Sequence, residues 1–159
     1  MLKEILTMDS GTVMISGGGK RLARLYFQSW AEKKGRALAE ELPFPVQGEI
    51  YVGNPFRADF PLYLIVNPLA RKGPEREKLL RWLKMKREEG KLVLLYEERY
   101  VGDSIARYRI REHLDYLIAY RRETMGAELL KVYKLENGRV VERKTYVRRP
   151  MTSGFGSER

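Results

Sequence analysis

The residues best suited to chemistry in this chain are three consecutive glycines followed by two basic side chains, Gly17-Gly18-Gly19-Lys20-Arg21. A short apolar run with β propensity, residues 12–16, precedes them, and residues 22–34 follow with the apolar spacing of a helix. Glycines between a strand and a helix leave backbone N–H groups accessible, and the N-terminal end of a helix favours an anion. This segment is therefore a candidate phosphate site, with Lys20 and Arg21 as its cations.

The same segment departs from the phosphate-binding loop of nucleotide hydrolases, whose pattern is G-x-x-x-x-G-K-[ST]. Its glycines run directly into Lys20, so the loop is too short to wrap a β-phosphate with N–H groups. Arg21 stands where a hydroxyl residue would hold Mg²⁺. A plain tight turn between strand and helix is the alternative interpretation of the three glycines. We predict no catalytic residue and no metal site.

Composition excludes several other classes of site. The 159 residues contain no cysteine and a single histidine, His113, which excludes disulfides and cysteine-ligated zinc and disfavours a histidine metal site or a Ser-His-Asp triad. No apolar run approaches the roughly 18 to 20 residues needed to span a bilayer. The first residues show no signal-peptide pattern, so a cytoplasmic location is expected.

Charge is abundant and unevenly distributed. Charged residues make up 33% of the chain, with two Gln and three Asn, which is typical of a thermophile and suggests an archaeal source. The formal net charge is +10, and residues 99–149 carry 13 basic and 7 acidic side chains. A polyanion is expected to dock on this last third, unless the excess charge only solvates the surface.

The order of elements predicts an α/β protein. Apolar runs at 62–66 and 92–96 indicate central parallel strands covered on both faces, and Gly73-Pro74 begins a predicted helix. A late strand is expected at 116–120, followed by a hairpin whose strands, 128–135 and 139–147, flank Glu136-Asn137-Gly138. Residues 1–150 then form one domain. Residues 151–159 lack a core pattern and are expected to be a disordered tail.

This layout resembles the RecA-like P-loop ATPases, especially archaeal RadB, RadA and the KaiC-like proteins, over about residues 10–150. The resemblance implies a trimmed three-layer core with a central, mainly parallel sheet and a C-terminal antiparallel hairpin. It also places Asn67 where the family ends its Walker B strand on an acidic residue, and Glu40 and Glu41 near the family's water-activating glutamate. With Arg21 in place of the hydroxyl residue, we expect neither ATP hydrolysis nor a bound cofactor.

The segment 96–111 is the strongest candidate for binding. Arginines alternate with apolar residues from Ala106 to Arg111, which predicts a strand with arginines on one face, although Asp103-Ser104 equally suits the start of a short helix. The resemblance puts this stretch where RecA-like proteins contact DNA. Arginines bind phosphates and tyrosines stack bases. The candidate nucleic-acid site comprises Arg99, Tyr100, Arg107, Tyr108, Arg109 and Arg111.

The alternative to a binding surface in the segment 96–111 is a cationic β-edge with its tyrosines packed inward. A second group of basic residues lies further along the chain. It either extends the same surface or only solvates the hairpin. That group comprises Lys131, Lys134, Arg143, Lys144, Arg148 and Arg149.

The leading hypothesis is a non-hydrolysing, RecA/RadB-like accessory protein. It would bind single-stranded DNA or RNA, or a recombination or repair partner such as an active RecA-like paralogue. One alternative is a pure protein-interaction module, with Phe155 as an anchor. Another is a nucleotide-sensing regulator that uses Lys20 and Arg21 on phosphates without hydrolysis.

Overall fold

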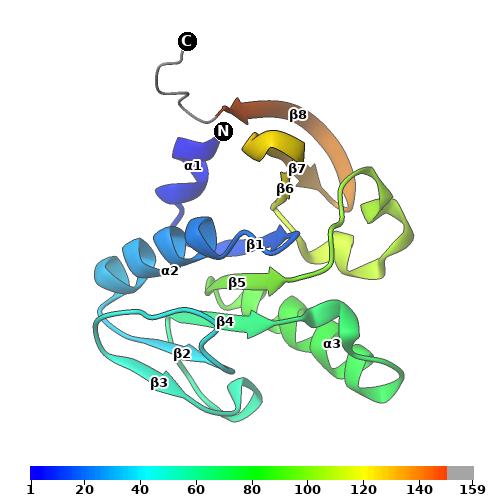
Figure 1. Cartoon of the computed structure of the whole chain (residues 1–159). Coiled ribbons are helices and arrows are strands. Elements are labelled where there is room, and N and C mark those ends of the chain that lie inside the picture. The colour runs from blue at the N-terminus through cyan, green and yellow to red at the C-terminus, as the bar shows by residue number, and fades with distance from the viewer. Residues whose placement is uncertain (150–159) are drawn as a thin grey trace.

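A single eight-stranded sheet organises the chain, in a computed structural model that describes residues 1–149. The strand order is β3-β2-β4-β5-β1-β6-β7-β8, parallel from β3 to β6 and antiparallel at β7 and β8 (Figure 1). The predicted α/β class, with a mainly parallel sheet and a C-terminal antiparallel hairpin, is confirmed. The expectation for residues 151–159 lies outside the described residues. The strands are β1 (Gly11–Ser16), β2 (Ala37–Ala39), β3 (Ile50–Val52), β4 (Leu62–Val66), β5 (Leu92–Glu97), β6 (Tyr116–Arg122), β7 (Glu128–Glu136) and β8 (Arg139–Arg148).

Helices cover both faces of the sheet and make three layers. α1 (Leu2–Leu6) and α2 (Lys20–Lys34) pack on one face, and α3 (Pro74–Glu88) packs on the other (Figure 1). Every residue of β4 and β5 is buried, as the continuous apolar runs predicted. Within the described residues, no helix is both long and apolar enough to cross a membrane.

The two long helices begin and end where their sequences predict. α2 buries Tyr26, Phe27 and Trp30 against the sheet and ends at Gly35, whose φ of 88° favours glycine. α3 begins with Pro74 at its first position, carries acidic residues in its first turn and buries Leu79 and Leu83 among others. Local capping and apolar spacing therefore agree with the tertiary packing.

The predicted strand over 106–111 is wrong. The chain there forms two 3₁₀ helices, η3 (Asp103–Arg107) and η4 (Arg109–His113), so the short-helix alternative is the one observed. A strand in this segment would need a sheet edge, but β6 already pairs with the second edge of β1. Ile105 and Ile110 are buried beneath the two turns instead.

The C-terminal hairpin matches its prediction. Asn137 and Gly138 have φ values of 52° and 80°, the pair of positive angles that a tight type I′ turn requires. β7 and β8 extend the sheet beyond the part that helices cover, and most of β8 is exposed. The hairpin thus adds a surface that the parallel core by itself would lack.

Candidate functional site

The glycine loop leaves β1 in a conformation that only glycine tolerates. The Gly17 N–H donates to the carbonyls of Glu97 and Arg99, at 3.0 and 3.1 Å. Its φ is 94°, and a Cβ at this position would lie 2.0 Å from the carbonyl oxygen of Tyr120. The loop is therefore pinned between the ends of β5 and β6.

The rest of the loop leaves backbone donors free at the start of α2. The Lys20 N–H donates to the Gly18 carbonyl at 2.8 Å, and the Ala23 N–H makes the first helical bond, to Gly19, at 2.9 Å. Within residues 1–149, the N–H groups of Gly18, Gly19, Arg21 and Leu22 donate to no protein acceptor. Such orphan donors, at the positive end of a helix, are suited to an anion.

These donors lie on a cavity of about 710 Å³ between the first turn of α2 and strands β6 to β8, which we name the α2 groove. The loop and helix contribute one wall, residues 18–22 and Leu25. The strands contribute the other wall, made of Tyr120, Arg122, Glu128, Leu130, Tyr146, Val147 and Arg148. Basic side chains thus stand on both sides of a largely apolar floor.

Glu128 organises the strand wall of the groove. Its side chain is 11% exposed and accepts a hydrogen bond from the Tyr120 hydroxyl at 2.7 Å. Arg122 lies 3.4 Å away, and the Arg148 guanidinium donates through Nε at 2.6 Å and also through Nη2. The Tyr120 hydrogen bond, together with those two arginines, lowers the pKa of Glu128 to about 2. The ionised carboxylate holds Arg148 and Arg122 at the groove.

Two acidic side chains at the carboxyl edge of the parallel strands are already used in internal contacts. Glu97 is buried and accepts the N–H groups of Leu69 and Arg99, at 3.0 and 2.9 Å. Glu40, which follows β2, pairs with the guanidinium of Arg71 and accepts the Val66 N–H at 3.3 Å. These carboxylates stabilise the edge of the sheet where the parallel strands end.

Asn67, which follows β4, also makes internal hydrogen bonds. Its φ of 50° lies in the left-handed region, and its side-chain amide pairs with Glu98, with distances of 3.1 Å to Oε1 and 3.0 Å from the Glu98 N–H. Across residues 1–149, no group of three or more His, Asp or Glu side chains is placed to hold a metal ion. The Asn67 side chain therefore fixes the turn that follows β4 by bonding to Glu98.

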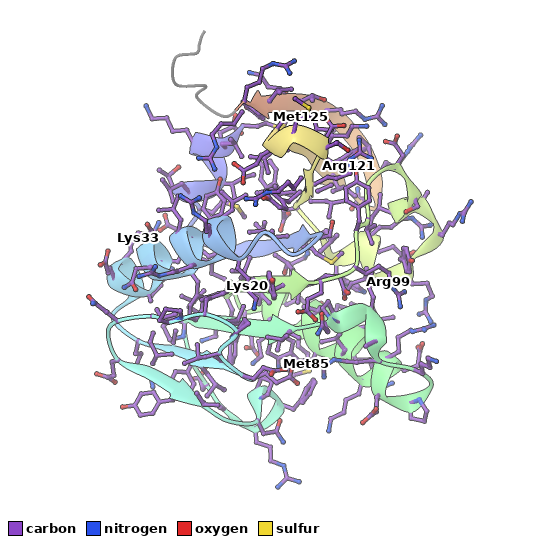
Figure 2. The ribbon with its side chains drawn as sticks, in the orientation of Figure 1. Lys20, Lys33, Met85, Arg99, Arg121 and Met125 are labelled. Atoms are coloured by element: carbon purple, nitrogen blue, oxygen red, sulfur yellow. The ribbon has the colours of Figure 1, made fainter. Side chains whose placement is uncertain are left out.

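The six residues of the predicted nucleic-acid site fall in three places. Arg99 and Tyr100 follow β5 beside the glycine loop, and Arg99 is labelled in Figure 2. The Arg121 guanidinium lies 5.6 Å from the Tyr100 ring centre. Arg107, Tyr108 and Arg109 line a smaller pocket against α3. Arg111 donates to the Tyr108 carbonyl at 3.0 Å. Arg107, Tyr108 and Arg109 thus share one pocket, which the other three residues do not line.

Sequence reasoning missed most of the strand wall of the groove. Arg148 belonged to the second basic group, but Tyr120, Arg122, Glu128 and Tyr146 were not singled out. Their proximity follows from pairing register, in which Glu128 faces Arg148 and Leu130 faces Tyr146. The period of two in the hairpin contained this signal, since Glu128 and Leu130 share one face of the sheet with their cross-strand partners Arg148 and Tyr146.

Comparison with known proteins identifies the fold. No family model matches the chain, and no curated protein matches it significantly. Among the solved structures that match, two have a TM-score of 0.50: the N-terminal domain of zonular occludens toxin from Neisseria meningitidis and the ATPase DotB from Legionella pneumophila. The chain shares the fold of these two structures.

The two matches differ in extent. The toxin domain is 10% identical, and the match covers 86% of this chain and 93% of that domain. DotB is 11% identical, and the match covers 84% of this chain and 47% of DotB. At these identities the likeness concerns the fold alone. The α2 groove lies where β1 passes into α2.

Replacing Gly17 by alanine is expected to destabilise the protein by about 2–5 kcal/mol, because the side chain meets the Tyr120 carbonyl and the φ is positive. Gly18→Ala is the matched control, since its φ is also positive but its surroundings are open, and about 1 kcal/mol is expected. Chemical denaturation of both variants gives the comparison. Equal losses would mean that the close approach to Tyr120 is not a constraint.

Glu128→Gln is expected to change how stability depends on pH. A carboxyl whose pKa falls from 4.5 to about 2 on folding contributes stability that is complete above pH 4.5 and lost as the pH falls toward 2. Thermal melts between these pH values should therefore show a smaller loss in Glu128→Gln than in the unsubstituted protein. Parallel curves for the two proteins would contradict the assigned hydrogen bonds and ion pairs of Glu128.

Proposed function

We propose that this protein is a non-hydrolysing accessory protein, of the RecA/RadB-like kind, that binds single-stranded DNA or RNA in the α2 groove. The observation that carries the proposal is the placement of cations on two opposite walls of one groove, with free backbone donors between them. Recombination and repair are the processes in which such an accessory protein, with or without an active paralogue, would act.

The groove offers a partner to each part of a nucleotide. Lys20, Arg21 and the free N–H groups at the start of α2 suit phosphate oxygens. Arg122 and Arg148 provide cations on the facing wall, where they remain well exposed although they contact Glu128. Tyr146 and the leucine side chains of the floor provide an apolar surface for a base.

The surroundings of the groove add further positive charge. Arg99 follows β5 next to the loop, and Arg121 precedes Arg122 at the end of β6 (Figure 2). Both side chains are exposed. Arg121 lies on the opposite face of β6 from Arg122 and is 3.8 Å from Glu123, so a strand would meet it only after passing over the edge of the sheet. A polymeric ligand that crosses this edge would meet both cations.

The absence of hydrolysis is supported by the state of the acidic residues. Glu40 is neutralised by Arg71, Glu97 is occupied by two backbone N–H groups, and the end of β4 offers Asn67 instead of a carboxylate. A phosphoryl transfer site needs acidic ligands for Mg²⁺ and a residue that positions the attacking water. Arg21 also takes the place of the hydroxyl that would bind the metal.

A free nucleotide is the second candidate ligand. The groove volume of about 710 Å³ lies within the range of roughly 300–1,000 Å³ that is usual for small-molecule sites. The same loop donors would bind its phosphates. The two ligands differ in what they require, since a polymer gains from Arg99 and Arg121 outside the groove and a mononucleotide does not.

Reversing the charge of the loop cations, by Lys20→Glu together with Arg21→Glu, is expected to weaken binding of a labelled single-stranded oligonucleotide by on the order of tenfold or more. The slope of log K against log salt should become shallower by about 0.7 for each phosphate that the variant no longer neutralises. Fluorescence anisotropy between about 50 and 300 mM salt measures both quantities.

Two comparison variants locate the site. Arg57→Glu with Arg81→Glu makes the same change of net charge at exposed positions away from the groove and is expected to leave binding within about twofold. Replacing Arg107, Arg109 and Arg111 by alanine tests the segment that the sequence favoured. A greater loss of affinity in this variant than in the loop variant would move the site away from the groove. Saturable competition by ATP alone would favour the mononucleotide.

Incubation with Mg²⁺ and ATP is expected to release no phosphate above background, with or without an oligonucleotide, because the acidic residues at the sheet edge are already paired. A colorimetric phosphate assay at high protein concentration measures this. Turnover that disappears in Glu40→Gln would contradict the proposal, because it would assign a catalytic role to that residue.

A further inference from the structure

The opposite face of the sheet carries a second hollow, of about 210 Å³, which we name the α3 pocket. It lies between the first half of α3 and the turns η3 and η4. Its floor is aliphatic, and Leu79, Leu80 and Ile110 there are 1%, 5% and 4% exposed. Its rim carries three arginines from three separate elements, Arg76, Arg107 and Arg109.

The rim keeps a net positive charge after its internal ion pairs are counted. Arg109 pairs with Glu77 at 2.7 Å. Arg76 donates through Nε to the Arg71 carbonyl at 3.1 Å, a hydrogen bond that leaves its charge uncompensated. Among residues 1–149, neither Arg76 nor Arg107 has an acidic partner within 4.0 Å. Two uncompensated guanidinium groups therefore flank an apolar depression.

The volume of the α3 pocket favours a single side chain over a small-molecule ligand. Small-molecule sites usually occupy about 300–1,000 Å³, so 210 Å³ is below that range. At about 30 Å³ for each water in the liquid, the pocket has the volume of about seven waters. That volume suits one aliphatic side chain, and buried apolar anchors of this kind contribute much of the binding energy at protein interfaces.

We propose that the α3 pocket binds an acidic peptide segment of a protein partner. One aliphatic side chain of the segment, such as leucine, enters the pocket, and flanking carboxylates pair with Arg76 and Arg107. Arginine binds carboxylates in a planar, two-bond geometry, which suits it to this role. Charge complementarity thus selects an acidic partner, while the floor selects an aliphatic anchor.

A nucleic acid fits the α3 pocket less well than a peptide does. Stacked bases need aromatic platforms, whereas this floor is made of leucine, isoleucine and proline, with the half-buried Tyr108 at its side. The pocket is also separate from the α2 groove, because its floor belongs to the apolar cluster on the α3 side of the sheet. The proposal therefore stands independently of nucleic-acid binding in the groove.

The test is a titration of the whole protein with fluorescein-labelled short peptides that carry one leucine between pairs of glutamates. Anisotropy is expected to show saturable binding, weakened about tenfold or more by Arg76→Glu with Arg107→Glu. Arg57→Glu with Arg81→Glu is the matched control, since both residues are exposed, neither lines the pocket and the change of net charge is the same, and a change in affinity below about twofold is expected. Replacing the peptide's leucine by alanine should weaken binding to a similar extent.

Several outcomes would overturn the proposal. One is the absence of saturable binding by any peptide of the series. Another is binding that is insensitive to Arg76→Glu with Arg107→Glu, or that does not need the leucine. Displacement of the peptide by a single-stranded oligonucleotide, in a variant whose groove carries Lys20→Glu and Arg21→Glu, would assign the α3 pocket to nucleic acid instead.

Discussion

The central parallel strands must be covered on both faces, and the rest of the molecule depends on this requirement. β1, β4 and β5 bury almost every residue, with alternate side chains entering apolar clusters on opposite faces of the sheet. α2 and α3 supply the two covers, and the connections from strand to helix meet at the carboxyl edge. Open α/β sheets bind ligands at this edge. The glycine loop, Asn67 and Glu97 lie at this edge because each stands at the carboxyl end of a parallel strand.

The antiparallel extension gives the edge its particular shape. β7 and β8 continue the sheet past the first turn of α2, so one face of the extension stays uncovered and a groove forms between helix and hairpin. Register then places Glu128 opposite Arg148, and Tyr120 and Arg122 reach the same carboxylate from β6. A carboxylate shielded from water has to be paired, and here its partners are also the cations of the groove wall.

The carboxyl edge of the sheet leaves backbone donors free at the glycine loop, while its acidic residues take part in internal contacts. Gly17 is pinned by two carbonyls, and four donors around the start of α2 remain free among the described residues. Nearby, Glu40 and Glu97 are held by Arg71 and by backbone N–H groups. An anion can therefore meet donors and cations at this edge, but a metal would first have to displace internal hydrogen bonds and ion pairs. This arrangement favours binding over phosphoryl transfer.

Most of the elements and the class of fold follow from local sequence patterns. Continuous apolar runs specify buried strands, Gly73-Pro74 begins a helix, and Asn137-Gly138 specifies a tight hairpin, because each signal is local. The comparison with solved structures agrees with this α/β fold. The glycine loop was also identified from sequence, since a strand, glycines and a helix in succession define its position.

The positions of the two hollows depend on tertiary packing. The alternation from Ala106 to Arg111 suits a strand as well as it suits two turns, and the outcome depended on β6 taking the edge of β1. Of the six residues predicted to act together, Arg107, Tyr108 and Arg109 line the α3 pocket and the other three do not. Both hollows join side chains that are far apart in the sequence, such as Lys20 with Arg148 and Arg76 with Arg107. Their proximity arises from strand register and helix packing, which are long-range interactions that no local pattern encodes.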